Sequence, residues 1–254
     1  MNLADMMRPE VRGFEPYLPG KPIEEVQREY KLKKIVKLAS NENALGCSPK
    51  VKRALAACAA DSFRYPEGPG TRLKEALAKK LSVSPQEIVL GAGSDEIIEI
   101  MGKAFFNRED EIIVSEHAFV RYKMAAELMG ANTLTVPMKN FKHDLAGMAA
   151  KIGPRTKAIF IANPNNPTGT YVSKSEVADF LAACRGRTGG SPRPPFIVFD
   201  EAYYEFARAL APDYPETLQD FKGGQNIVIL RTFSKAFGLA GLRVGYGIMI
   251  REAA

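Results

Sequence analysis

Two charged residues directly follow apolar runs of the sequence and could do chemistry. Asp200 ends the run FIVFD, and Lys235 follows the run NIVILRTFS. Open α/β sheets bind ligands at the carboxyl ends of their strands, so both side chains are expected beside a ligand. A partly buried lysine has a lowered pKa, which favours imine formation, and a buried carboxylate needs a cation or a donor. A helix-capping aspartate and a surface lysine in a turn are the alternative interpretations.

The residues around Lys235 could hold a phosphate ester. Thr232 and Ser234 come just before the lysine, and Arg243 follows it by eight residues across a glycine-rich turn. Hydroxyl groups and a guanidinium group are common phosphate ligands, although each of these residues alone is weak evidence.

The segment GAGSDE (91–96) is a second candidate phosphate site. Here a strand is expected to pass through glycines into a helix, whose first amides include those of Ser94 and Asp95. The exposed amides and the helix dipole favour an anion at such a junction. An ordinary strand-to-helix turn with acidic first-turn residues explains the segment equally well.

Two other strand ends carry side chains that could face a planar ligand. Asn166 lies in the turn ANPNNPTG, where asparagine can give directed hydrogen bonds. Asparagine, proline and glycine also favour turns for backbone reasons alone. Phe119 follows EIIVSEHA and could stack on a ring or simply pack in the core.

The elements that must position these residues alternate between short β-branched runs and amphipathic segments. The runs are EIVLGAG, EIIVSEHAF, NTLTVPM, KAIFIANP, FIVFDEAYY and NIVILRTFS. This alternation predicts βαβ units and a largely parallel sheet. A strand is also expected at 35–38, helices after the caps Ser48 and Thr71, and a solvated loop at 185–195.

Composition limits the class of protein. Of the 254 residues, 46% are hydrophobic and 25% charged, as in ordinary globular proteins. The formal net charge of +6 is not concentrated in one run, so we expect no nucleic-acid partner. The three cysteines lack C-x-x-C spacing, which indicates reduced thiols. Without a signal peptide or a run near the ~20 apolar residues that span a bilayer, a cytoplasmic protein with no membrane partner is expected.

Other chemistries find little support in the sequence. His117 and His143 are the two histidines and have no partners at metal-ligand spacing, so no metal is expected. The sequence has no G-x-S-x-G or Walker motif, and GAGSDE lacks the spacing of a dinucleotide site.

Taken in order, ANPNNPTG, DEAYYEF and TFSKAFGLAGLRVG resemble the signature of fold-type I enzymes that depend on pyridoxal 5'-phosphate. The intervals agree as well, with 34 residues from Asn166 to Asp200, 35 from Asp200 to Lys235 and eight to Arg243. The resemblance implies an α/β fold, the three-layer αβα large domain of these transferases, with a mostly parallel sheet.

The N-terminal half is similar to histidinol-phosphate aminotransferases in FEPYLPGK, KLASNENALG, FRYPEGPGTRLKEALA and VLGAGSDEIIEI. It departs from them at Ala44, where the family usually has proline, and at SEHAFVRY, which lacks the usual proline. The resemblance implies an N-terminal arm with part of a small domain at 1–40 and a cofactor-binding large domain at 41–254. Because the chain stops soon after VGYGIMI, we expect the large domain to be incomplete and a C-terminal small domain, with the arginine that pairs with the substrate, to be absent.

The resemblance also implies a role for each matching residue. Lys235 would form the Schiff base and act as general base, and Asp200 would pair with the pyridine nitrogen. Tyr203, the third catalytic residue, would bind the phenolic oxygen of the cofactor together with Asn166. The other residues would surround the cofactor or the substrate: Phe119 on the ring face; Ser94, Asp95, Thr232, Ser234 and Arg243 at the phosphate; Tyr65 at the phosphate of a neighbouring subunit; and Tyr17 in the substrate pocket. The role of Tyr65 implies a homodimer.

The implied reaction is ping-pong amino transfer from L-histidinol phosphate to 2-oxoglutarate, giving imidazole-acetol phosphate and L-glutamate in histidine biosynthesis. A threonine-phosphate decarboxylase-like enzyme, another amino-acid aminotransferase and a catalytically defective fragment remain alternatives. A transcription regulator with an aminotransferase-like domain would need a helix-turn-helix, for which the residues before 41 leave no room.

Overall fold

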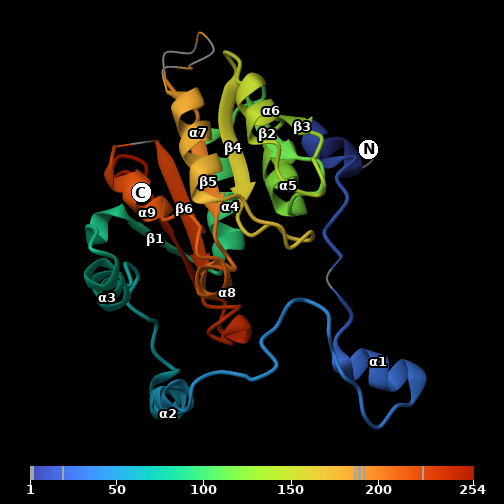
Figure 1. Cartoon of the computed structure of the whole chain (residues 1–254). Helices are drawn as coiled ribbons and strands as arrows, with labels where there is room; N and C mark the ends of the chain where they lie inside the picture. The colour runs from blue at the N-terminus through green and yellow to red at the C-terminus, as the bar shows by residue number, and fades with distance from the viewer. Residues whose placement is uncertain (1–2, 19, 186, 188–189, 191–192, 225) are drawn as a thin grey trace.

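The computed structural model describes residues 3–18, 20–185, 187, 190, 193–224 and 226–254. Within these residues the strands form one seven-stranded sheet with helices on both faces (Figure 1). The strands are β1 (Ile88–Gly91), β2 (Glu111–Ser115), β3 (Asn132–Val136), β4 (Thr156–Ala162), β5 (Phe196–Asp200), β6 (Ile227–Thr232) and β7 (Gly245–Ile248). The α-helices are α1 (Ile23–Tyr30), α2 (Pro49–Cys58), α3 (Thr71–Leu81), α4 (Ser94–Phe105), α5 (Val120–Leu128), α6 (Leu145–Ala150), α7 (Lys174–Cys184), α8 (Tyr204–Leu210) and α9 (Thr217–Lys222).

The sheet order brings the predicted site residues to one edge. The strands lie in the order β1-β7-β6-β5-β4-β2-β3. β7 is antiparallel to both of its neighbours, and the other neighbouring strands are parallel. Asp200 at the end of β5 pairs with Ala162 on β4 and with Leu230 on β6. The carboxyl ends of these three strands therefore lie side by side.

The apolar runs form central strands because both faces of the sheet are covered. On β5, Ile197 and Phe199 pack in a core with helices α3, α6, α7 and α9, whereas Val198 packs on the opposite face with α4 and α5. A strand buried on both faces has few polar positions before its end. The structure thus confirms the predicted α/β fold with three layers and a mostly parallel sheet.

The N-terminal segment lies largely outside these layers. Helices α1 and α2, which are fully described, bury none of their residues, and Figure 1 shows α1 standing apart from the sheet. Further towards the N-terminus, the guanidinium of Arg8 donates to the carbonyl of Leu128 at 2.9 Å, and Glu10 pairs with Arg108. After α1, the carbonyl of Ser40 accepts from Lys235 and the side chain of Asn41 donates to Tyr203. The segment thus contacts the sheet domain before and after α1.

Three local predictions have different outcomes. Ser48 caps α2 and accepts from the amide of Lys50, as predicted. Thr71 is instead the first residue of α3, because Gly70 takes the capping position with φ +63°. Residues 35–38, all of them described, form no strand. They pair with none of the described strands, and the side chains of Val36 and Leu38 are exposed. The expected loop at 185–195 lies partly outside the described residues.

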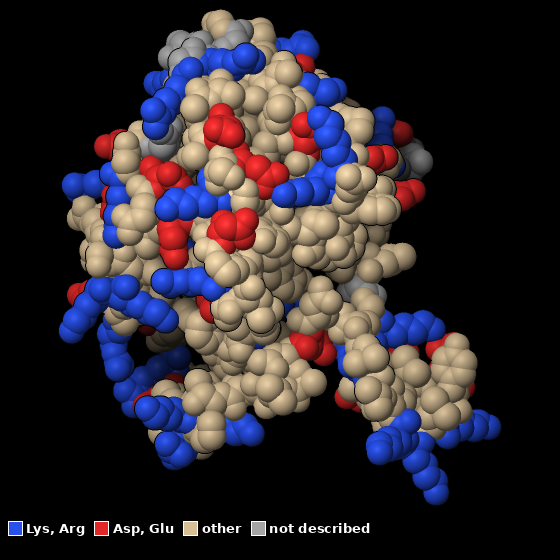
Figure 2. Space-filling model, in the orientation of Figure 1, with Lys and Arg blue, Asp and Glu red and all other residues tan. Residues whose placement is uncertain are grey.

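The distribution of surface charge and the lengths of the helices relate to the expected absence of nucleic-acid and membrane partners. On the face in Figure 2, lysine and arginine lie intermixed with aspartate and glutamate over the sheet domain. This mixture agrees with the sequence, in which the positive charge is not concentrated in one run. In the described part of the chain, none of the helices has the length and apolarity needed to cross a bilayer.

Candidate active site

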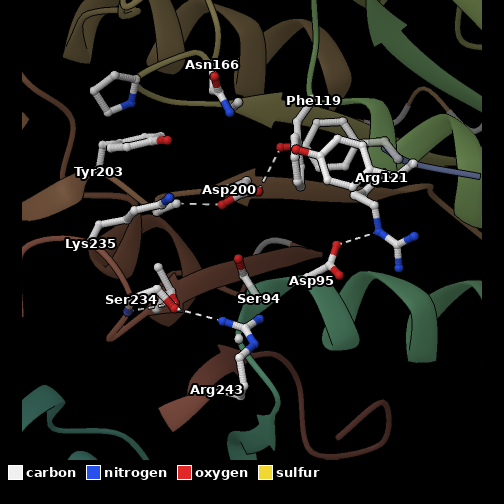
Figure 3. A pocket seen from close by; sticks show the side chains of 17 residues that line it. Ser94, Asp95, Phe119, Arg121, Asn166, Asp200, Tyr203, Ser234, Lys235 and Arg243 are labelled. Atoms are coloured by element: carbon white, nitrogen blue, oxygen red, sulfur yellow. Dashed lines mark hydrogen bonds and ion pairs between the residues drawn. The ribbon is translucent and has the colours of Figure 1, made fainter. Parts of the chain in front are cut away.

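One pocket at the carboxyl edge of the sheet gathers all the predicted site residues except Tyr65 (Figure 3). The pocket has a volume of about 210 Å³. The site residues predicted from the sequence that line this pocket are Tyr17, Ser94, Asp95, Phe119, Asn166, Asp200, Tyr203, Thr232, Ser234, Lys235 and Arg243. They come from seven separate segments of the chain, which the fold brings together.

The first turn of α4 forms one end of the pocket. Its N-cap residue Gly93 has φ +86° and no side chain with which to cap the helix. Gly245 on β7 packs so closely that a Cβ there would lie 2.5 Å from the carbonyl carbon of Gly93 and 2.6 Å from the amide nitrogen of Ser94. The two glycines place no side chain over this helix N-terminus, whose first amides, those of Ser94 and Asp95, favour an anion.

Hydroxyl and guanidinium groups complete this end of the pocket. The side chains of Thr232 and Ser234 are hydrogen-bonded at 3.0 Å. Arg243 donates to the hydroxyl of Ser234 at 3.3 Å and to the carbonyl of Ala92 at 2.7 Å. Arg243 is thereby fixed between the end of β6 and the start of α4. Together with the amides, these groups match the donors that a phosphate ester requires.

Asp200 is a buried carboxylate, only 5% exposed. Its Oδ2 accepts from the hydroxyl of Tyr122 at 2.8 Å, and its Oδ1 accepts from the amide of Ala202 at 3.2 Å. Burial raises the pKa of Asp200 to about 6, although both hydrogen bonds act in the opposite direction. A cation placed against this carboxylate would favour its ionised form.

Lys235 is half-buried on the loop after β6. Its Nζ donates to the carbonyl of Ser40 at 3.0 Å and lies 5.7 Å from the centre of the Tyr203 ring. Partial burial lowers the pKa of Lys235, and the positive charge of Arg243 adds to this effect. Both causes increase the fraction of neutral amine, which is the nucleophilic form.

Tyr203 and Asn166 approach the pocket from two neighbouring loops. The hydroxyl of Tyr203 accepts a hydrogen bond from the side chain of Asn41 at 2.8 Å. The turn that carries Asn166 is held by Asn163, whose side chain bonds both the carbonyl and the amide of Val172. Asn165 also holds this turn, because its side chain donates to the carbonyl of His117 and to the hydroxyl of Thr168, both at 2.9 Å. Asn166 instead lines the pocket.

Sequence reasoning missed two residues that follow Phe119. Tyr122 is fully buried, stacks on Phe160 with ring centres 4.7 Å apart, and bonds Asp200. Arg121 lines the pocket and pairs with Asp95 through Nε and Oδ1 at 2.6 Å. Both lie within three residues of Phe119, in the first turn of a helix that follows a strand end, and this position was the available signal.

Two tyrosines lie at or beyond the margin of the pocket. Tyr17 lines it but is 51% exposed. Tyr65 is fully exposed, and the fold does not bring it to the pocket of its own chain.

The fold matches the large domain of the fold-type I transferases, and the pocket lies at the carboxyl edge of its sheet. The model of the aminotransferase class I and II family matches residues 33–254. The chain belongs to this family.

Individual relatives are consistent with the family. The chain is 46% identical over 246 residues to a histidinol-phosphate aminotransferase of Moorella thermoacetica, covering 96% of this chain and 61% of the relative. It is 45% identical to histidinol-phosphate aminotransferase 2 of Methylococcus capsulatus, covering 98% and 66%. The solved histidinol-phosphate aminotransferase of Sinorhizobium meliloti in complex with pyridoxal 5'-phosphate superposes with a TM-score of 0.84 at 28% identity, covering 97% and 64%. The chain thus spans less than two thirds of the length of these relatives.

Proposed function

We propose that this protein binds pyridoxal 5'-phosphate and transfers the amino group of L-histidinol phosphate to 2-oxoglutarate, giving imidazole-acetol phosphate and L-glutamate in histidine biosynthesis. The observation that carries the proposal is a single pocket with a half-buried lysine, a buried carboxylate and a set of phosphate donors. The relatives named histidinol-phosphate aminotransferase support the choice of substrates.

The donor groups of the pocket fit this cofactor at both ends. A protonated pyridine nitrogen would supply the cation that the burial of Asp200 calls for. Phe119, from the end of the loop after β2, would lie against the ring. The phosphate would be held by the amides of Ser94 and Asp95 and by the side chains of Thr232, Ser234 and Arg243.

When bound, the cofactor supplies an aldehyde that captures amines and a ring that withdraws electrons from the substrate carbon. Lys235 would hold the aldehyde carbon in the resting enzyme and, once displaced by the substrate amine, move a proton from the substrate α-carbon. Its lowered pKa favours the neutral amine that both tasks need. Asp200 would keep the ring nitrogen protonated, and Tyr203 and Asn166 would donate to the phenolic oxygen.

The remaining roles concern the substrate and a second subunit. Tyr17 would contact the substrate at the margin of the pocket. The full exposure of Tyr65 supports a role across a homodimer interface, at the phosphate of the neighbouring subunit. We assign 1–40 to an arm with part of a small domain and 41–254 to the large domain. The partners are then the small-molecule substrates and a second copy of the chain, without nucleic acid or membrane, in the cytoplasm.

Reductive labelling tests the cofactor site. The chain is incubated with pyridoxal 5'-phosphate, reduced with borohydride and digested, and the adduct is located by peptide mass spectrometry. We expect stoichiometric labelling at Lys235 and its loss in Lys235→Ala. Lys222→Ala is the matched control, because Lys222 donates to a backbone carbonyl, that of Leu81, and lies away from this pocket. Labelling scattered over several lysines would refute the site.

A product assay tests the reaction. With L-histidinol phosphate and 2-oxoglutarate, the proposal predicts L-glutamate formation that depends on both substrates and on Lys235. With L-threonine O-phosphate in place of L-histidinol phosphate, carbon dioxide release without glutamate formation would instead support the threonine-phosphate decarboxylase-like alternative. Labelling at Lys235 without either product would support the catalytically defective alternative for this chain.

A further inference from the structure

Arg121 lines the pocket, but its guanidinium is engaged by helix α4. It stands in the first turn of α5, and its side chain is 19% exposed. Nε donates to Oδ1 of Asp95 at 2.6 Å, and Nη2 pairs with Oε2 of Glu99 at 3.3 Å. Figure 3 shows the Asp95–Arg121 pair at the side of the pocket away from Lys235.

The position of Asp95 creates an electrostatic problem for the proposed phosphate subsite. Asp95 is in the first turn of α4, and its side chain is 39% exposed and lines the pocket. Its amide is one of the proposed phosphate donors, so its carboxylate would lie close to the doubly charged phosphate. Two like unit charges about 4 Å apart repel each other by roughly 1 kcal/mol in water, and by more where water screens them incompletely.

We propose that Arg121 is a positioning residue for the phosphate subsite: it turns the carboxylate of Asp95 towards α5 and neutralises it, so that the first turn of α4 can accept a phosphate dianion. The inference rests on the proposed function and adds to it a residue outside the predicted set. Arg121 acts through Asp95, because its three guanidinium nitrogens are directed to Asp95, to Glu99 and, at 4.0 Å, to the sulfur of Met124.

Glu99 gives the arrangement a second anchor. It also pairs with Lys103 at 2.7 Å on the exposed side of α4. Asp95, Arg121, Glu99 and Lys103 thus form a row of ion pairs that runs from the pocket to the surface. Lys103 offers a matched control, because Lys103→Gln removes the same unit of positive charge from the same glutamate without touching Asp95.

The test compares the dissociation constants of pyridoxal 5'-phosphate and of pyridoxal, which lacks the phosphate, measured by absorbance titration of the full chain. We expect Arg121→Gln to weaken binding of the phosphorylated ligand about tenfold, and binding of pyridoxal much less. Arg121→Lys should recover part of the affinity, and Lys103→Gln should change neither constant. The loss in Arg121→Gln should shrink as salt is added.

Removal of Asp95 separates the proposed role from a structural one. Asp95→Asn alone should leave the affinity for the phosphorylated ligand equal or higher, and Asp95→Asn with Arg121→Gln should restore it. Equal losses for both ligands, or a weaker Asp95→Asn variant, would mean that the ion pair merely holds α4 on α5 and would overturn the inference. A loss that persists in the double variant would place Arg121 directly on the phosphate and overturn it too.

Failure of the proposed function gives a different result. If the unmodified chain binds pyridoxal 5'-phosphate no better than pyridoxal, the pocket is not a phosphate-bearing cofactor site, and the inference about Arg121 falls with it. If the unmodified chain prefers the phosphorylated ligand and Arg121→Gln keeps that preference, the cofactor site stands and the inference alone is wrong.

Discussion

The hydroxyl of Tyr122 on helix α5 donates to Oδ2 of Asp200 at the end of strand β5, at 2.8 Å. Both side chains are buried, and the tyrosine ring is stacked on Phe160. A hydrogen bond to a carboxylate favours its ionised form, so Tyr122 partly offsets the effect of burial on the pKa of Asp200. Tyr122 thus supports the charge that would face the cofactor ring.

Replacement of Tyr122 by phenylalanine should therefore weaken cofactor binding most at low pH. The ring stack on Phe160 is kept, and the loss of one hydrogen bond to a charged group costs about 1.5–3 kcal/mol. The pKa of Asp200 should rise further, so the pH below which pyridoxal 5'-phosphate is released should move upward. Titration of the ligand over a range of pH checks both effects.

Tyr171→Phe is the control for this substitution, because the Tyr171 hydroxyl also bonds a carboxylate, that of Asp213, at 2.7 Å but away from the pocket. The same affinity and pH profile in Tyr122→Phe and in the unmodified chain would contradict the role of Tyr122.

Asp200 should make the stability of the cofactor-free protein depend on pH. Its pKa in the fold is about 6, above the ~3.9 of an unfolded chain, so the unfolded state releases the proton first as pH rises. The contribution of Asp200 to stability is therefore greatest below about pH 4, declines as pH rises to about 6 and is constant above that. The difference of about two pKa units corresponds to roughly 3 kcal/mol.

Asp200→Asn removes this titration. The free energy of unfolding of the variant, minus that of the unmodified chain, should grow by up to about 3 kcal/mol between about pH 4 and pH 7. Urea unfolding of both proteins without cofactor at several pH values gives this difference directly. If it is constant with pH, the raised pKa of Asp200 is wrong.

The positions of the pocket residues could be predicted from the sequence for a physical reason. Strands covered on both faces are largely apolar before their ends, so Asp200 marks the end of a strand, and Lys235 marks a loop beyond one. Because the carboxyl ends of parallel strands meet at one edge of the sheet, residues that follow such ends were expected to lie close together without knowledge of the strand order.

Features that depend on packing between distant segments could not be predicted in this way. Arg121 and Tyr122 belong to an ordinary helical pattern, and their contacts with Asp95 and Asp200 depend on how α5 lies against α4 and β5. The segment VGYGIMI reads as apolar, but its antiparallel place between β1 and β6 is set by long-range pairing. The prediction of a strand at 35–38 is wrong for the same reason, because local propensity cannot show whether a neighbouring strand is available for pairing.

Breaking the buried ion pair between Arg231 and Glu201 should lower the free energy of unfolding far more than breaking an exposed ion pair. Arg231 and Glu201 are 5% and 1% exposed, and they pair at 2.8 Å. Arg231→Met should lower the free energy of unfolding by about 3–5 kcal/mol, because it leaves a buried carboxylate without its cation. Chemical denaturation measures the loss.

The double variant Arg231→Met with Glu201→Gln should recover much of that stability, since no buried charge is left unpaired. Arg208→Met is the control for an exposed pair: Arg208 and Glu216 lie 3.2 Å apart with side chains 61% and 43% exposed. It should change the free energy of unfolding by about 1 kcal/mol or less. Equal effects of the two arginine substitutions would argue against the dominance of the buried pair.

The close approach of β7 to the start of α4 should make Gly245 intolerant of a side chain. A Cβ at this position would meet backbone atoms of Gly93 and Ser94 at 2.5–2.7 Å, and backbone cannot rotate away as a side chain can. Gly245→Ala should therefore push the first turn of α4 out of position and weaken binding of pyridoxal 5'-phosphate about tenfold or more. Binding of pyridoxal should fall less, because the displaced amides face the phosphate. Gly153→Ala, where a Cβ meets nothing within 4 Å, should leave both affinities unchanged. An unaltered preference for the phosphorylated ligand in Gly245→Ala would mean that the amides of α4 contribute little to its binding.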